Sequence, residues 1–208
     1  MSRLHLGVGG GGGEADNLTP EQNMDVPSDH FTHVLTNFAL IPIPEPRACI
    51  AECFRVLRPS GTSAFTIWKR VGWYPSAVAA IARIPGAPLV PPFSEFGRVF
   101  LKDPQEGDDW TDMGFVEREL RNAGFEDVQI VLHKNVVVLP SAEEYVKNYA
   151  AMTMTMLRNA WTEEEQGRVA PHFDAALLEE LKSQFGDGEV LTEWEAWCVT
   201  ARVPARKT

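Results

Sequence analysis

The stretch from residue 32 to residue 68 constrains the fold more than any other part of the chain. "THVLTNFAL" (Thr32–Leu40) is short and rich in Val, Leu, Thr and Phe, which is typical of a buried strand. "PEPRACIAECFRVLRPSG" follows with apolar residues at helical spacing, and prolines stand before and after it. "TSAFTIW" (Thr62–Trp68) has the pattern of a second buried strand. A strand, a helix and a strand with short links predict a βαβ unit, and hence an α/β fold with a parallel sheet.

The rest of the chain continues this alternation of helices and strands. A short helix at Ser76–Ala82 precedes a proline-rich, lid-like segment, and "MGFVERELRNAGFEDVQIVLHK" predicts a helix, a stop at Gly124 and a strand. Two capping-box patterns, Ser141 with Glu144 and Thr162 with Glu165, each predict the start of a helix. The alternating "VLTEWEAWCVTARV" near the end predicts an edge or antiparallel strand with one buried face.

Composition bounds the partners and the compartment. The net charge of −10 argues against nucleic acid or an anionic membrane as a main partner. No apolar stretch has the length of a membrane-spanning helix or a signal peptide, and three cysteines do not make a disulfide framework. We therefore expect a cytoplasmic protein with reduced thiols. Two candidate ligand sets, Asp29 with His30 and His33, and Cys49 with Cys53, lack further convergent ligands, so no metal site is predicted.

Several segments, in order, resemble a known family. "NMDVP" (23–27), "FTHVLTNFAL" (31–40), "ECFRVLRPSGTSAFTIW" (52–68) and "ELRNAGFEDVQIV" (119–131) resemble parts of the class I S-adenosylmethionine-dependent methyltransferases. The likeness is greatest to the small-molecule enzymes of fungal secondary metabolism. It implies a doubly wound, mostly parallel, methyltransferase-like sheet over residues 23–208, with an antiparallel C-terminal strand.

The resemblance also implies where ligands bind. In such a fold, ligands lie at the carboxyl ends of the strands. The implied S-adenosyl-L-methionine contacts are Asn23, Met24, Asp25, Asn37 and Phe38. The implied pocket for a small-molecule substrate comprises Trp68, Trp73, Tyr74 and Trp110. No residue is singled out as a catalytic base.

The glycine run "GVGGGGG" at residues 7–13 matches the pattern G-x-G-x-x-G, but its surroundings do not fit a cofactor loop. Two βαβ crossovers, about 60 residues, are expected between such a loop and Asp25, and only Glu14–Met24 separate them. A functional loop also needs a strand before it and a helix after it. We therefore interpret residues 1–22 as a flexible Gly-rich tail and the fold as truncated at its N-terminal side.

This interpretation leaves two functions open. If the first strands are absent, the strand at Thr32–Leu40 has an open edge, which a second copy or a partner chain would cover. The first function is methyl transfer to a small molecule in secondary metabolism, with cofactor binding by the chain alone in doubt. The alternative is a non-methylating subunit or pocket protein, which binds a partner chain or catalyses a rearrangement. A truncated sequence of a longer enzyme is a further interpretation.

Overall fold

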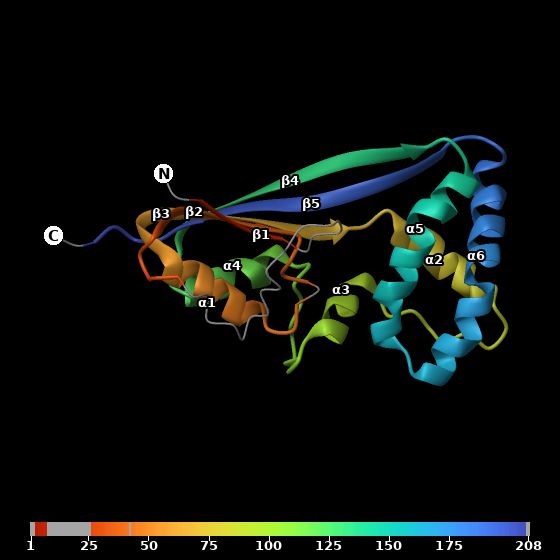
Figure 1. Cartoon of the computed structure of the whole chain (residues 1–208), viewed down its shortest axis with the longest axis horizontal. Coiled ribbons are helices and arrows are strands. Elements are labelled where there is room, and N and C mark those ends of the chain that lie inside the picture. Colours follow the sequence, from red (N-terminus) through yellow and green to blue (C-terminus); the bar gives the residue numbers. More distant parts are fainter. Residues whose placement is uncertain (1–2, 8–25, 42, 207–208) are drawn as a thin grey trace. The chain divides into compact units, whose positions relative to one another are not determined.

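The computed structural model describes residues 3–7, 26–41 and 43–206 (Figure 1). The chain divides into two compact units where the sequence predicted one domain over residues 23–208. Unit 1 comprises Met1–Lys69, Phe100–His133 and Ala196–Thr208, and unit 2 comprises Arg70–Val99 and Lys134–Glu195.

Five strands form a sheet in the order β1-β2-β3-β5-β4. They are β1 (Arg3–Gly7), β2 (Phe31–Asn37), β3 (Leu57–Arg70), β4 (Glu126–Leu139) and β5 (Val190–Arg202). β1 runs parallel to β2, and β2 runs parallel to β3. β2 and β3 are the two strands that the sequence predicts around the central helix, so the parallel βαβ unit and the α/β class are confirmed.

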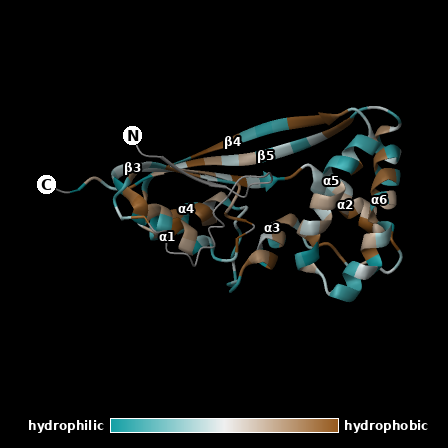
Figure 2. Cartoon of the chain, viewed as in Figure 1, coloured by the Kyte–Doolittle hydropathy of each residue, from teal (hydrophilic) through white to brown (hydrophobic). Residues whose placement is uncertain are grey.

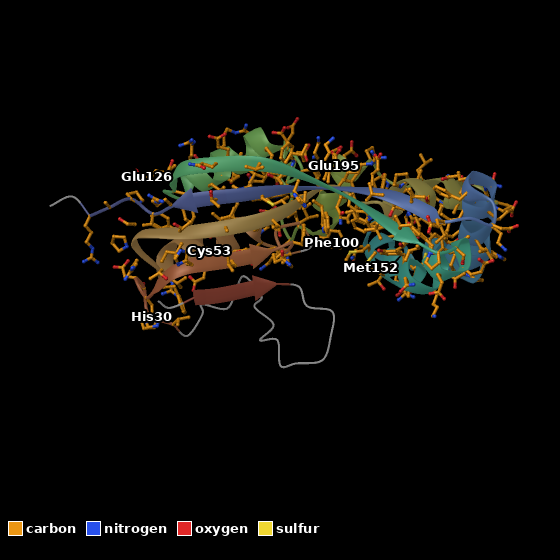
Figure 3. The ribbon with its side chains drawn as sticks, turned by 90° about the horizontal axis from the view of Figure 1, so that it is seen from above. His30, Cys53, Phe100, Glu126, Met152 and Glu195 are labelled. Carbon is orange, nitrogen blue, oxygen red and sulfur yellow. The ribbon has the colours of Figure 1, made fainter. Side chains whose placement is uncertain are left out.

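The expectation of an open edge at Thr32–Leu40 was wrong. β1 pairs with β2 from Arg3 opposite His33 to Gly7 opposite Asn37, and Figure 3 shows the two strands side by side. Five residues of the predicted flexible tail are therefore a strand, and residues 8–25 lie outside the described residues. Five residues are too few to show a clear hydrophobic pattern, and a strand of this length is stabilised by its pairing with the rest of the sheet.

β5 runs antiparallel to β3, as predicted for the C-terminal strand. In unit 1, the amide of Val203, just after β5, donates to the carbonyl of Gly61 near the start of β3 (2.9 Å). In unit 2, Arg70 at the end of β3 pairs with Glu193 near the start of β5 (2.7 Å). The late residues of one strand thus meet the early residues of the other.

β4 is the outermost strand and runs antiparallel to β5. Lys134 contacts Glu195 (2.9 Å), and the hydroxyl of Thr192 donates to the carbonyl of Val137 further along β4 (3.4 Å). Figure 2 shows a hydrophilic centre in β4 between apolar ends. A lysine on an edge strand disfavours pairing with a further strand, because its charge would be buried.

Two helices cover one face of the sheet in unit 1. In α1 (Pro46–Val56), Ile50, Cys53 and Val56 are fully buried, as the helical spacing predicts. α4 (Met113–Asn122) begins at Asp112, whose side chain accepts a hydrogen bond from the amide of Phe115 (2.7 Å). Figure 1 places both helices on the same side of the strands. The second helical layer of a doubly wound sheet is not found among the described residues of this unit.

Unit 2 is built around three helices. They are α2 (Trp73–Ala82), α5 (Ala142–Leu157) and α6 (Glu163–Phe185), with the short α3 (Phe93–Phe96) and 3-10 turns at Gly97–Phe100 and Arg158–Ala160. α2 and α5 both pack against α6. Ser141 caps α5, and Thr162 with Glu165 forms a complete capping box at α6, so both predicted helix starts are confirmed. No helix among the described residues has the length and apolarity needed to cross a membrane.

Candidate functional site

The carboxyl ends of β1 and β2 lie in one row with Thr66 of β3 in unit 1. Gly7, the last residue of β1, is opposite Asn37, the last residue of β2, and Asn37 is opposite Thr66 of β3. In open α/β sheets this edge is where ligands bind, because loops diverge there and leave backbone groups free to make contacts. The row therefore marks the candidate site.

Phe38, which directly follows β2, holds a strained backbone at this edge. Its φ of 52° lies in the left-handed region, which an aromatic residue seldom adopts. Its amide donates to Thr66, both to the backbone carbonyl (3.1 Å) and to the side-chain oxygen (2.9 Å). Such strain persists only where the surrounding structure fixes it, and it is frequent at ligand sites.

Thr66 also fixes the side chain of Asn37. Its hydroxyl donates to Oδ1 of Asn37 (2.7 Å), so that the amide nitrogen of Asn37 is oriented as a donor. Asn37 is exposed. Thr66 is not among the residues predicted from the sequence. Its position five residues into the predicted strand and opposite Asn37 was the available signal, but reading it requires the register of the sheet.

An aromatic platform adjoins these polar groups. The ring of Phe38 stacks on that of Trp68, with centroids 3.8 Å apart and an interplanar angle of 9°. Both side chains are half-buried. A face of this kind attracts cations and planar groups, because the ring carries negative charge density above its plane.

Of the predicted ligand contacts, Asn37, Phe38 and Trp68 come together in unit 1. The predicted cofactor contacts Asn23, Met24 and Asp25 lie outside the described residues. Their assignment stays a prediction.

Trp110 lies in the hydrophobic core of unit 1 rather than at this edge. It is 1% exposed and meets Phe115 edge-on at 5.1 Å. Its assignment to a substrate pocket stays a prediction.

Trp73 and Tyr74 lie in unit 2, at the start of α2. They form an aromatic cluster with Phe93 and Phe96, and the hydroxyl of Tyr74 donates to the carbonyl of Pro91. Burial raises the pKa of Tyr74. The cluster anchors the proline-rich segment that the sequence analysis expected to be lid-like, and the role of both residues in a substrate pocket stays a prediction.

Arg47 fastens the segment around residue 108 to the start of α1, which follows the candidate edge. Its guanidinium contacts Asp108 and Glu119, each at 2.6 Å, and lies over the ring of Trp110 at 5.7 Å. The hydrogen bond with Asp108 is the main cause that raises the pKa of Arg47. The side chain of Asp108 is 1% exposed, so Arg47, which is 38% exposed, contacts a buried carboxylate.

The buried thiols of unit 1 are not nucleophile candidates. Cys53 is fully buried against the hydroxyl of Thr36 (3.6 Å), and Figure 3 shows it inside unit 1. The hydrogen bond with Cys53, and then burial, raises the pKa of Cys49. Among the described residues, no three His, Cys, Asp or Glu side chains gather as a metal site would require.

Comparison with known proteins gives this edge a context. Residues 6–65 match the family model described as "Methyltransferase domain". The chain is similar to methyltransferases. The matched stretch runs from the end of β1 to the middle of β3, so it contains Gly7 and Asn37 and ends one residue before Thr66.

Curated relatives extend the similarity over most of the chain. "Methyltransferase tpcH" of Aspergillus fumigatus is 29% identical over 184 residues, covering 88% of this chain and 63% of that protein. "Methyltransferase ktnA" of Aspergillus niger is 28% identical, covering 88% and 64%. "Acetylaranotin bis-thiomethyltransferase" of Aspergillus terreus is 29% identical, covering 90% and 61%. The chain thus spans less than two thirds of the length of these relatives.

Proposed function

We propose that this protein transfers a methyl group from S-adenosyl-L-methionine to a small molecule, and that the cofactor binds at the carboxyl ends of β1, β2 and β3. The observation that carries the proposal is the row of Gly7, Asn37 and Thr66. β1 is a strand that directly precedes the glycine run, and a cofactor loop needs a strand before it and a helix after it. The similarity to fungal methyltransferases supports the same reaction class.

The described residues at this edge fit a cationic, partly planar cofactor. The amide nitrogen of Asn37 is oriented to donate to a carboxylate or hydroxyl, because Thr66 occupies its oxygen. The stacked rings of Phe38 and Trp68 suit a positively charged sulfonium or a purine. When bound, the cofactor supplies an activated methyl group for in-line displacement. On the adenine side we assign Asn23, Met24 and Asp25, as the resemblance implies.

The residues of this edge act by positioning. The two hydrogen bonds from the amide of Phe38 to Thr66 hold the strand ends in a fixed geometry. Fixed geometry lowers the barrier of a displacement, because the entropy of aligning donor and acceptor is lost on binding rather than in the reaction. No side chain of the described residues is assigned as a general base.

A thermal-shift experiment on the whole chain tests the proposal. S-adenosylhomocysteine, the demethylated product, is added at about 100 times its dissociation constant, where binding to the folded state alone adds about 2.7 kcal/mol to stability. We expect a clear rise in Tm with this compound and none with equimolar methionine. No rise at millimolar concentrations would contradict the proposal and favour a non-methylating subunit or pocket protein.

A further inference from the structure

Two tyrosines lie on one face of α5, in unit 2, and one of them has a buried hydroxyl without a partner. Tyr145 and Tyr149 are one helical turn apart, and their ring centroids lie 5.0 Å from each other. Tyr145 is 1% exposed, and its hydroxyl makes no hydrogen bond with any described residue. A buried hydroxyl without a partner costs about 1–3 kcal/mol, so its presence in a core needs an explanation.

The Tyr145 hydroxyl is a hydrogen-bond donor. Burial is the main cause that raises its pKa, with a smaller contribution from Tyr149, so the phenol is neutral at physiological pH. The hydroxyl of Tyr74 in the same unit donates to a backbone carbonyl, whereas that of Tyr145 has no such acceptor. Among the described residues, no oxygen accepts a hydrogen bond from the Tyr145 hydroxyl.

Trp194 of β5 forms a wall beside these tyrosines. Its ring lies 5.9 Å from that of Tyr149, and its indole nitrogen donates to the hydroxyl of Thr192 (3.0 Å). Gly72 makes room for it, because a Cβ there would lie 2.4 Å from the indole nitrogen. Tyr149 and Trp194 are half-buried, so this aromatic surface reaches solvent while Tyr145 lies beneath it.

The same stripe of α5 continues into an adaptable apolar side chain. Met152 follows Tyr145 by two helical turns and is half-buried; Figure 3 labels it in the helical unit. The whole chain carries a net charge of −10. A neutral ligand is therefore favoured over an anion at this position.

We propose that Tyr145, Tyr149 and Trp194 form a binding site for a neutral, planar aromatic molecule that carries a carbonyl oxygen. The carbonyl accepts the hydrogen bond of Tyr145, and the ring packs on Trp194 in the place that Tyr149 occupies in the free protein. A change of rotamer at Tyr149, on the solvent side of Tyr145, admits the ligand. This ligand class describes the small molecule of the proposed function. That the ligand accepts the methyl group rests on the proposed function.

The test compares two ligands that differ in one oxygen. 1-Indanone is a planar aromatic ketone, and indane is the hydrocarbon of the same shape. Both are titrated by ligand-observed NMR against the whole chain without a methyl donor, so the result does not depend on methyl transfer. We expect indanone to bind about five- to tenfold more tightly than indane, the usual strength of one hydrogen bond to a neutral acceptor.

Tyr145→Phe is the diagnostic variant. It should abolish the preference for indanone, leave indane binding unchanged, and keep or raise the Tm, because it removes only an unpaired hydroxyl. Tyr74→Phe is the matched control. It should lower the Tm, since Pro91 loses its donor, and should retain the preference for indanone.

Three results would overturn the site. They are equal binding of the two ligands by the wild-type chain, an unchanged preference in Tyr145→Phe, and no binding of either ligand. Binding of S-adenosylhomocysteine without a preference for indanone would remove this site and leave the proposed function intact. The preference for indanone without cofactor binding would support the site and contradict methyl transfer.

Discussion

Gly7 and Asn37 are opposite each other in parallel register at the last residues of β1 and β2. This one pairing gives β2 a neighbour on its outer side and places the start of the glycine run at the carboxyl end of the sheet. All five residues of β1 take part in this parallel pairing, which is made by backbone hydrogen bonds.

Removal of residues 1–7 should expose the edge of β2. Leu35 already has 36% of its surface exposed, and the backbone groups that β1 pairs would become free. We expect stronger binding of a hydrophobic dye and self-association in sedimentation velocity, because open strand edges pair with other chains. Removal of residues 1–2 alone keeps β1 and should behave as wild type. An unchanged sedimentation coefficient and dye binding after the longer deletion would show that β1 does not protect β2.

Arg47→Ala should destabilise unit 1. The substitution removes the guanidinium that contacts the carboxylate of Asp108, whose side chain is 1% exposed. The expected loss is about 2–3 kcal/mol in the free energy of unfolding by urea, less than for a fully buried pair because Arg47 is partly exposed. Lys147→Ala removes an exposed pair with Glu144 and should change stability by about 0.5 kcal/mol or less. Equal effects of the two substitutions would contradict the role of Arg47.

Two glycines of unit 2 should respond to alanine in opposite directions. At Gly72 a Cβ would lie 2.4 Å from the indole nitrogen of Trp194, so Gly72→Ala should cost about 1–3 kcal/mol. At Gly167, inside α6, a Cβ meets no atom within 4 Å, so Gly167→Ala should stabilise by about 0.5–1 kcal/mol. Urea unfolding checks both, and a neutral Gly72→Ala would contradict the close packing of Trp194.

The ion pair of Glu143 with Lys182, which joins α5 to α6 at 2.6 Å, should make stability depend on pH. The hydrogen bond from Lys182 lowers the pKa of Glu143 from 4.5 to about 2. Since the folded-state pKa is depressed, the contribution is present above about pH 4.5 and is lost as the pH falls through about 2. For Lys182, the pKa is raised from 10.5, chiefly by Glu143, so the contribution is also lost at strongly alkaline pH.

Glu143→Gln checks this pH dependence. Its Tm should be lower than that of wild type between about pH 5 and pH 9, and the two values should approach each other as the pH falls from about 4.5 through 2. In the background of Lys182→Met, the same substitution should have no such effect. A difference in Tm of constant size from pH 7 to pH 2 would show that the pair is not its cause.

The sequence predicted those parts of the fold whose pattern is local. The buried spacing of Ile50, Cys53 and Val56 and the caps at Ser141 and Thr162 depend on nearby residues, and each is confirmed. β1 was not predicted because it forms by pairing with β2, whose residues lie 30 positions further along the chain. The stretch between Gly13 and Asp25 is too short for two βαβ units, but a single strand needs no such unit to pair directly with β2.

The site shows the same limit. Asn37, Phe38 and Trp68 were predicted because the resemblance supplies them, and the structure brings these three together in unit 1. Thr66, which orients both Asn37 and Phe38, and Tyr145, with its unpaired hydroxyl, required the register and the burial of the folded chain. Hydrogen-bond satisfaction is a property of three-dimensional packing, and no sequence pattern encodes it directly.

Calorimetric titration of the wild-type chain, Thr66→Val and Thr62→Val with S-adenosyl-L-methionine tests the central claim most directly. Thr66→Val keeps the shape of the side chain but removes the hydroxyl that contacts Phe38 and Asn37. Thr62, the control, lies on the same face of β3 four residues earlier, opposite His33. The account predicts binding by the wild-type chain and by Thr62→Val, and about tenfold weaker binding by Thr66→Val, as expected for the loss of about 1.4 kcal/mol. No binding by the wild-type chain, or equal binding by all three, would contradict it.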